Sequence, residues 1–229
     1  MKIAVPKEIK NGECRVALTP DAVRALKNAG HSPIVQQSAG VLSGFSDAEY
    51  RRTGAKIART AQELWLQADL IVKVKEPQKS EFRFFTKSKI LFCYLHLAAE
   101  PALARALLSS GITAIASETV EDSAGHFPLL EPMSEIAGRM SVLIGAYYQS
   151  VPRGGGGVLI SGLPGVLPAH VVIIGGGTVG ENAARIASGM GAQVTILDNR
   201  QERLRILDEL LPENVSTLIS SPANIEQSL

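Results

Sequence analysis

Three polar residues in the first half of the sequence follow apolar runs and have side chains suited to a small carbonyl compound. Arg15 lies in a loop after the run KIAV, Lys75 closes the run DLIVKVK, and His96 follows the run KILFCYL. An arginine holds a carboxylate with two parallel hydrogen bonds, a lysine offers a charge to an oxygen atom, and a histidine exchanges a proton near neutral pH. Together they predict a 2-oxo acid site, in which a carbonyl held by Lys75 gains a proton from His96 as a hydride arrives from a nicotinamide.

Each of these residues has a purely structural alternative. A single arginine in a loop is usually solvated, a lysine at a strand end is common at a sheet edge, and a histidine among apolar residues is more often part of a core. Lys73 would share a strand face with Lys75, because side chains alternate along a strand, so the pattern does not separate these two lysines. His31, His126 and His170 lie in turns or just before an apolar run, where we expect structural roles.

A glycine motif in the second half of the sequence predicts a nucleotide-binding turn. The segment VVIIGGGTVG places Gly175, Gly177 and Gly180 at the spacing GxGxxG, directly after an apolar run and before a helical pattern. The first glycine permits a tight turn, the second lets the backbone approach a pyrophosphate, and the third allows the helix to pack closely on the strand. The N–H groups at the start of the helix would hold the anion.

An acidic residue at the end of the next apolar run indicates which dinucleotide is bound. Asp198 has the position of a carboxylate that hydrogen-bonds the adenosine ribose. It would repel a 2′-phosphate, so NAD is favoured over NADP, although Arg200 and Arg203 lie close to it. The alternative is a glycine-rich turn that only tightens the packing of a strand and a helix.

The elements that position these residues follow from an alternation of apolar runs and helical patterns. Strands are expected over residues 2–5, 33–37, 69–75, 89–95 and 112–117. Helix starts are indicated at Thr19-Pro20, Ser46-x-x-Glu49, Thr60-x-x-Glu63 and Pro101. Such alternation favours a mostly parallel sheet covered by helices. Ligands bind beyond the carboxyl ends of the strands in such sheets, so Arg15, Lys75 and His96 should face one crevice.

The second half begins with a long helical pattern from Met133 to about Tyr147, followed by a hinge of four glycines at residues 154–157. Strands are then expected over residues 171–174, 193–197 and 215–219, with helices between them and a further helix start at Ser221-Pro222. Three strands make one half of a doubly wound sheet and leave one side of the first strand unpaired. We therefore predict an α/β fold, with a substrate domain on a mostly parallel sheet over residues 1–132 and a Rossmann-type NAD-binding domain, incomplete at its C-terminus, over residues 133–229.

Composition agrees with a globular protein that acts on small molecules. Of the 229 residues, 45% are hydrophobic and 20% are charged, which excludes disordered and fibrous classes. The net charge of +1 gives no attraction to nucleic acid or to an anionic membrane. Cys14 and Cys93 are too few for a disulfide scaffold or a thiolate metal site, and we predict no bound metal. The N-terminus lacks a signal-peptide pattern and no apolar run is long enough to span a membrane, so we expect a cytoplasmic protein.

Five stretches of the sequence, in order, resemble the alanine dehydrogenase family, whose superfamily also contains the alpha subunit of NAD(P) transhydrogenase. They are VPKEIKNGECRVALTP, KVKEP, LFCYLHLAA, PLLEPMSEIAGRM and VVIIGGGTVGENAARIASGMGAQVTILD. The resemblance implies the NAD-dependent, reversible oxidative deamination of L-alanine to pyruvate and ammonium. Arg15 and Lys75 match the substrate-binding positions of the family, and His96 matches its catalytic histidine. The resemblance thereby selects Lys75 over Lys73.

The resemblance also implies contacts to the cofactor and to other subunits. The family's NAD-contacting positions correspond to Ser134, Thr178, Val179, Asp198, Arg203 and Ser220, and the family is expected to form homo-oligomers, hexamers among them. Family members continue beyond residue 229, and their catalytic aspartate and nicotinamide contacts lie in that continuation. The alternatives are a non-catalytic NAD-binding or interaction protein, and a transhydrogenase alpha-subunit relative, which would lack the signature around His96.

Overall fold

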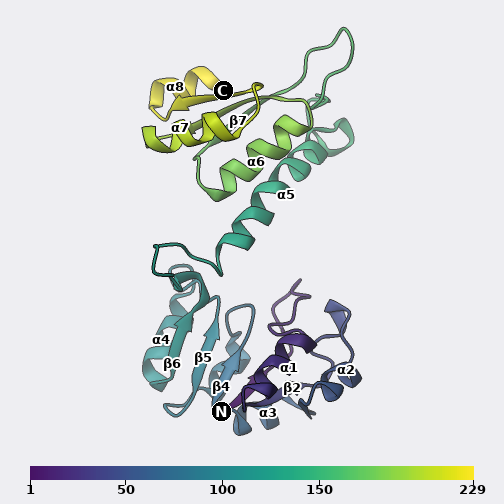
Figure 1. The fold of residues 1–229 in the computed structure, drawn as a ribbon, viewed down its shortest axis with the longest axis vertical. Helices are drawn as coiled ribbons and strands as arrows, with labels where there is room; N and C mark the ends of the chain where they lie inside the picture. Colours follow the sequence, from purple (N-terminus) through teal and green to yellow (C-terminus); the bar gives the residue numbers. More distant parts are fainter. The chain divides into compact units, whose positions relative to one another are not determined.

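The computed structural model describes residues 1–229, which form two compact units, Met1–Phe127 and Pro128–Leu229 (Figure 1). The division falls after Phe127 and not after residue 132. The helix expected from Met133 begins earlier, at Glu131, and it lies wholly in the second unit.

The first unit is built on a sheet of six parallel strands in the order β3-β2-β1-β4-β5-β6. The strands are β1 (Lys2–Val5), β2 (Ser32–Gln36), β3 (Lys56–Ala58), β4 (Leu70–Val72), β5 (Ile90–Cys93) and β6 (Thr113–Ala116). The prediction of a mostly parallel sheet is confirmed, although the short strand β3 was not predicted. The chain order reverses between β1 and β4, which is the point where open α/β sheets bind their ligands.

The helices of this unit begin where the sequence predicts. Thr19, Ser46 and Thr60 are N-caps whose side chains accept a backbone N–H from the first turn, and Ser46 forms a complete capping box with Glu49. The helices are α1 (Pro20–Asn28), α2 (Asp47–Arg52), α3 (Ala61–Gln67) and α4 (Pro101–Ser110), with the short 3₁₀ helices η1 (Val41–Ser43), η2 (Lys79–Phe84) and η3 (Ser117–Thr119).

Both faces of this sheet are covered, because its strands alternate buried side chains between two apolar clusters. In β1, Ala4 belongs to the cluster around Trp65 of α3, and its neighbour Val5 belongs to the cluster around Tyr50 of α2. Burial on both faces explains why these strands read as continuous apolar runs. The polar loops that follow β1, β4 and β5 lie at the carboxyl ends of the strands and not on the covered faces.

Strand β4 is shorter than the predicted run 69–75 and ends at Val72. Lys73 and Lys75 therefore lie beyond the strand and not on one strand face, which corrects that expectation. The reason lies in the neighbouring strand: β1 ends at Val5, and the N–H of Val74 donates instead to the carboxylate of Glu8, at 2.7 Å.

The second unit contains three parallel strands in the order β7-β8-β9, so β7 pairs with β8 on one side and with no strand on the other. This confirms the predicted half of a doubly wound sheet. The strands are β7 (His170–Ile174), β8 (Gln193–Asp198) and β9 (Val215–Ile219), and the helices are α5 (Glu131–Gln149), η4 (Val151–Arg153), α6 (Thr178–Gly189), α7 (Gln201–Leu210) and α8 (Pro222–Ser228). None of the helices in the chain combines the length and the apolar character needed to cross a membrane.

Helices α5 and α6 lie side by side in the second unit (Figure 1). A Cβ atom on Gly138 of α5 would lie only 2.2 Å from the carbonyl oxygen of Val179, so glycine is required for this close approach. The core between the helices and the sheet is filled by small residues of α6 and by apolar residues of the strands and of α7, among them Ala184, Ile196 and Leu207.

Candidate active site

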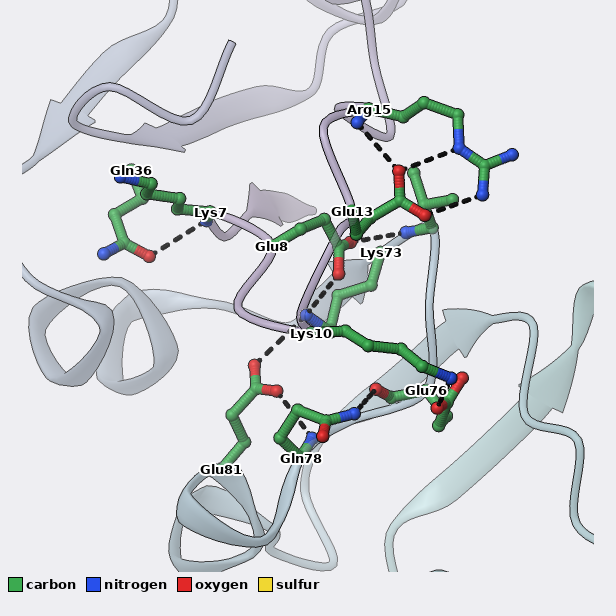
Figure 2. A network of polar contacts seen from close by, with 11 residues as sticks. Lys7, Glu8, Lys10, Glu13, Arg15, Gln36, Lys73, Glu76, Gln78 and Glu81 are labelled. Carbon is green, nitrogen blue, oxygen red and sulfur yellow. Dashed lines mark hydrogen bonds and ion pairs between the residues drawn. The ribbon is translucent and has the colours of Figure 1, made fainter. Parts of the chain in front are cut away.

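The loops that follow β1 and β4 are joined by a buried carboxylate at the point where the strand order reverses. Glu8 accepts the N–H of Val74 through Oε1, at 2.7 Å, and the ammonium of Lys73 through Oε2, at 3.0 Å. Lys73 also pairs with Oε1 of Glu81 at 3.2 Å. All three charged side chains are buried, and Figure 2 shows Glu8 and Glu81 reaching Lys73 from the loop after β1 and from η2.

Burial and charge act against each other in this ion-pair triad of Glu8, Lys73 and Glu81. Burial alone lowers the pKa of Lys73, but the charges and hydrogen bonds of Glu81 and Glu8 raise it above its ordinary value. Burial raises the pKa of Glu81, against the opposing effect of Lys73. Lys73 is thus fully engaged within the protein.

Lys75 differs from Lys73 in its burial and in the partners of its ammonium. It is half-buried, and no hydrogen bond or ion pair within the chain holds its ammonium. Its charge nevertheless contributes to lowering the pKa of Glu13, so Lys75 lies within electrostatic reach of the loop that carries Arg15. The geometry distinguishes the two lysines, which the sequence pattern did not.

Arg15 is oriented by a carboxylate two residues before it. Glu13 accepts the backbone N–H of Arg15 and its Nε through Oε1, both at 2.8 Å, and Nη2 through Oε2, at 2.6 Å (Figure 2). The Arg15 hydrogen bond is the main cause that lowers the pKa of Glu13, and Glu13 in turn raises the pKa of Arg15. The Glu13 side chain is 6% exposed and that of Arg15 is 49% exposed, so the guanidinium extends outward from a buried partner.

His96 lies in a strained turn after β5. Its φ angle is +48°, a left-handed conformation that is uncommon for residues other than glycine. Glu118 holds this turn by accepting the N–H of His96, at 2.8 Å, and the N–H of Leu95 at 3.1 Å. The side chain of His96 is exposed and its ring makes no hydrogen bond in the structure. The backbone is therefore fixed while the imidazole remains available.

The sequence pattern did not reveal the carboxylates that organise this edge, namely Glu8, Glu13, Glu76, Glu81 and Glu118. For Glu8, Glu13 and Glu76 a signal was present, because KEIKNGECR and KVKEP place acidic residues among basic ones, whereas nothing in the sequence pattern marked Glu81 or Glu118. No three or more histidine, cysteine, aspartate or glutamate side chains lie together so that they could hold a metal ion.

In the second unit, the glycine turn has the geometry that its spacing predicts. Gly175 has a φ angle of +104° and donates its N–H to the carbonyl of Leu197, at 2.7 Å. A Cβ atom on Gly180 would lie 1.9 Å from the carbonyl oxygen of Gly175, so the helix packs directly on the turn. A Cβ atom on Gly177 would meet no atom within 4 Å, so the turn is open on the side of the α6 N-terminus.

Asp198, at the end of β8, closes this turn with its carboxylate. Oδ2 accepts the N–H of Gly176, at 2.8 Å, and Oδ1 accepts the N–H of Arg200, at 2.9 Å. Burial raises the pKa of Asp198, but these backbone hydrogen bonds outweigh burial and lower it. The N–H of Ser220 donates to the carbonyl of Asp198, at 3.0 Å, which places Ser220 on the same carboxyl edge.

The other predicted cofactor residues fall into two groups. Arg203 supports the turn, because its Nε donates to the carbonyl of Gly176 at 2.6 Å and its Nη2 pairs with Glu181 at 2.5 Å. Ser134, Thr178 and Val179 line a groove of about 920 Å³ that is bounded by α5, β7 and the start of α6. The structure thus places Arg203 against the turn and the other three beside open space.

Comparison with known proteins assigns both units to one family. The model of the alanine dehydrogenase/PNT N-terminal domain matches residues 4–137, and the model of the alanine dehydrogenase/PNT C-terminal domain matches residues 141–229. The resemblance found in the sequence is thereby confirmed.

Individual relatives agree with the family models. Alanine dehydrogenase of Methanococcus maripaludis is 54% identical over 229 residues, which cover 100% of this chain and 61% of that protein. The solved structure of an L-alanine dehydrogenase is 48% identical with a TM-score of 0.91, covering 100% of this chain and 63% of that one. A transhydrogenase from Sinorhizobium meliloti, 23% identical with a TM-score of 0.78, covers 99% and 66% of the two chains and shares the fold. The chain spans less than two thirds of these relatives, and it belongs to the alanine dehydrogenase/PNT family.

Proposed function

We propose that this chain carries the substrate site and the adenosine half of the cofactor site of an NAD-dependent dehydrogenase that interconverts L-alanine with pyruvate and ammonium. The observation that supports this best is the carboxyl edge of the first sheet, where Arg15 and Lys75 extend from loops joined by the carboxylate of Glu8. His96 follows the neighbouring strand. Membership of the alanine dehydrogenase/PNT family supplies the substrate class.

Each of the three residues has a distinct role in this proposal. Arg15 binds the substrate carboxylate, because its guanidinium is already oriented by Glu13 and reaches outward. Lys75 directs its unpaired ammonium to an oxygen of the substrate and so favours negative charge there. His96 gives or takes the proton at the reacting centre, for which an imidazole is suited near neutral pH.

The residues of the second unit fit NAD. The turn is open at Gly177, where a pyrophosphate would approach the first N–H groups of α6. Asp198 has a second acceptor position on Oδ2 for a ribose hydroxyl. Ser134, Thr178, Val179 and Ser220 would contact the cofactor, with Arg203 supporting the turn. When bound, NAD supplies the hydride acceptor of the reaction.

The deciding experiment is an assay of NADH oxidation with pyruvate and ammonium. It compares the 229-residue chain with a hybrid in which this chain continues into the C-terminal remainder of the Methanococcus maripaludis relative. Turnover by the hybrid is expected. A hybrid that folds and binds NADH without turnover would contradict the proposal and favour a non-catalytic NAD-binding protein.

The cofactor assignment has its own test in NADH and NADPH titrations followed by fluorescence. NADH should bind more tightly than NADPH, and Asp198→Ala should weaken NADH binding by about tenfold or more, because one charged hydrogen bond is lost. Unchanged affinity in this variant would contradict the role of Asp198 at the ribose.

We also propose that the chain assembles with copies of itself in the cytoplasm. Exposed apolar side chains on α5 support the assembly: Ile136, Met140, Leu143, Ile144 and Tyr147. The two free cysteines, Cys14 and Cys93, are compatible with a reducing compartment. Light scattering of the hybrid should report a multiple of the chain mass, and a monomer would contradict the assembly.

A further inference from the structure

Glu76 is a buried carboxylate at the candidate active site with only one of its oxygens in use. The residue is 3% exposed and follows Lys75 directly. Its Oε1 pairs with the ammonium of Lys10 (Figure 2). Its Oε2 is buried and has no hydrogen-bond partner. A buried acceptor without a donor destabilises the folded chain. A nearby donor that has no partner of its own would satisfy this oxygen.

Glu76 and His96 follow neighbouring strands of the sheet. Strands β4 and β5 pair in parallel, with Ile71 opposite Leu91 and Val72 opposite Phe92. The backbone pairing continues beyond the strands, because the N–H of Tyr94 donates to the carbonyl of Val74, at 3.1 Å. The pairing ends there, since the N–H of His96 donates to Glu118, and Glu76 and His96 each follow two residues after this last paired position.

Electrostatics agree with this placement. Burial raises the pKa of Glu76, but the hydrogen bond from Lys10, the backbone N–H of Glu76 itself, the charge of Lys10 and, least of all, the charge of His96 lower it below its ordinary value. Glu76 is therefore ionised near neutral pH and lies within the electrostatic reach of the imidazole. The ring of His96 makes no hydrogen bond, and its backbone is already held by Glu118.

We propose that Glu76 is the positioning residue of His96, whose ring donates one N–H to Oε2 of Glu76 while Lys10 holds Oε1. This inference rests on the proposed function, which assigns proton transfer to His96. A carboxylate that accepts one ring N–H fixes the tautomer, so the other ring nitrogen is bare and can take a proton from the substrate. Lys10 occupies Oε1, which leaves Oε2 for the ring of His96.

The tautomer of His96 tests the proposal without any need for turnover. The chain contains four histidines, so ¹⁵N-labelling of the ring nitrogens gives few signals, and a His96→Asn variant assigns those of His96. With the ring neutral, we expect one tautomer whose N–H proton is protected from exchange. A mixture of tautomers such as free histidine shows would overturn the proposal.

Two variants, one of Glu76 itself and one of its partner Lys10, make the test specific. In Glu76→Gln, the amide oxygen stays with Lys10, which only donates, so the amide NH₂ turns toward His96 and should select the opposite tautomer. In Lys10→Met, the carboxylate remains and the tautomer of the unsubstituted chain should persist. If Glu76→Gln leaves the tautomer unchanged, the proposal fails. If that variant does not fold, the unsubstituted chain and Lys10→Met still decide.

Kinetics of the hybrid enzyme separate this role from substrate binding. Glu76→Gln should lower kcat by about 10²- to 10⁴-fold, the usual contribution of a positioned acid or base, with little change in the KM for pyruvate. A raised KM for ammonium with an unchanged tautomer would show that Oε2 binds the amino group, and would overturn the proposal. A hybrid inactive with pyruvate and ammonium that shows the tautomer reversal would contradict the proposed function and support the positioning role.

Discussion

Glu8 and Val74, 66 positions apart in the sequence, are joined by a hydrogen bond of 2.7 Å from the Val74 N–H to the Glu8 carboxylate. This bond connects the loop that carries Arg15 to the loop that carries Lys75. Because Glu8 also binds the ammonium of Lys73, one side chain holds both loops at the reversal of the strand order. The relative position of Arg15 and Lys75 therefore depends on a residue that forms no hydrogen bond or ion pair with either of them.

Glu8→Gln should destabilise the chain by about 3–5 kcal/mol, because it leaves the buried ammonium of Lys73 with only one counter-charge. Urea unfolding followed by circular dichroism measures this loss. The control is Arg24→Gln, which removes an exposed ion pair to Asp21 and should cost less than about 1 kcal/mol. Equal losses in the two variants would show that the triad does not stabilise the loops.

Substituting the two neighbouring lysines should have opposite consequences. Lys75→Gln removes an ammonium without a partner, so the free energy of unfolding should change by less than about 0.5 kcal/mol. In the hybrid, the same substitution should raise the KM for pyruvate about 10- to 100-fold, because a charged hydrogen bond to the substrate is lost. Lys73→Gln should reduce stability first, because its ammonium is paired with Glu8 and Glu81. A stable Lys73→Gln enzyme with a raised KM for pyruvate would contradict the assignment of the two roles.

Two alanine substitutions in the glycine turn should separate folding from binding. In Gly180→Ala, the new Cβ would meet the Gly175 carbonyl oxygen at 1.9 Å, and we expect a loss of about 1–3 kcal/mol from overpacking. In Gly177→Ala, the Cβ meets nothing within 4 Å and φ is −69°, so the chain should fold with no loss of stability.

The second of these variants should still weaken NADH binding by about tenfold or more, because the methyl group occupies the space through which the pyrophosphate approaches the backbone. Thermal melting and NADH titration of both variants provide the measurements. Normal NADH affinity in Gly177→Ala would exclude this turn as the pyrophosphate site.

Asp198 should contribute to stability in a pH-dependent way. Its folded-state pKa lies below the ordinary value of 3.8, so its contribution is complete above that value and is lost as the pH falls through the lower folded-state pKa. Asp198→Asn should therefore lower the melting temperature at neutral pH, and the difference from the unsubstituted chain should shrink at about pH 3. A difference that is the same at both pH values would mean that the carboxylate charge does not stabilise the turn.

Local sequence signals predicted the helix starts and the glycine turn correctly, because each depends on residues within a few positions. Thr19 caps α1 by accepting the N–H of Ala22, and Gly180 packs against Gly175 in the same turn. The parallel sheet was also predictable, since its strands are buried on both faces and read as apolar runs.

The partners of the charged residues were not predictable, because they come from distant parts of the chain. The end of β4 at Val72 depends on Glu8, and the conformation of His96 depends on Glu118. Likewise, Lys73 is paired and Lys75 is not, because Glu81 of η2 contacts the first lysine and not the second. No periodicity in DLIVKVK contains that information.

The two sheets of this chain would respond differently to mutation. The turn of the second unit acts through backbone N–H groups, so few single substitutions can give it a new ligand without damaging the fold. The first sheet has the strand order of a nucleotide-binding fold, yet its open edge is lined by side chains on separate loops. Single codon changes in those loops can therefore alter the side chains at this edge while the sheet stays intact, which makes the first unit the natural target for directed evolution of a binding site.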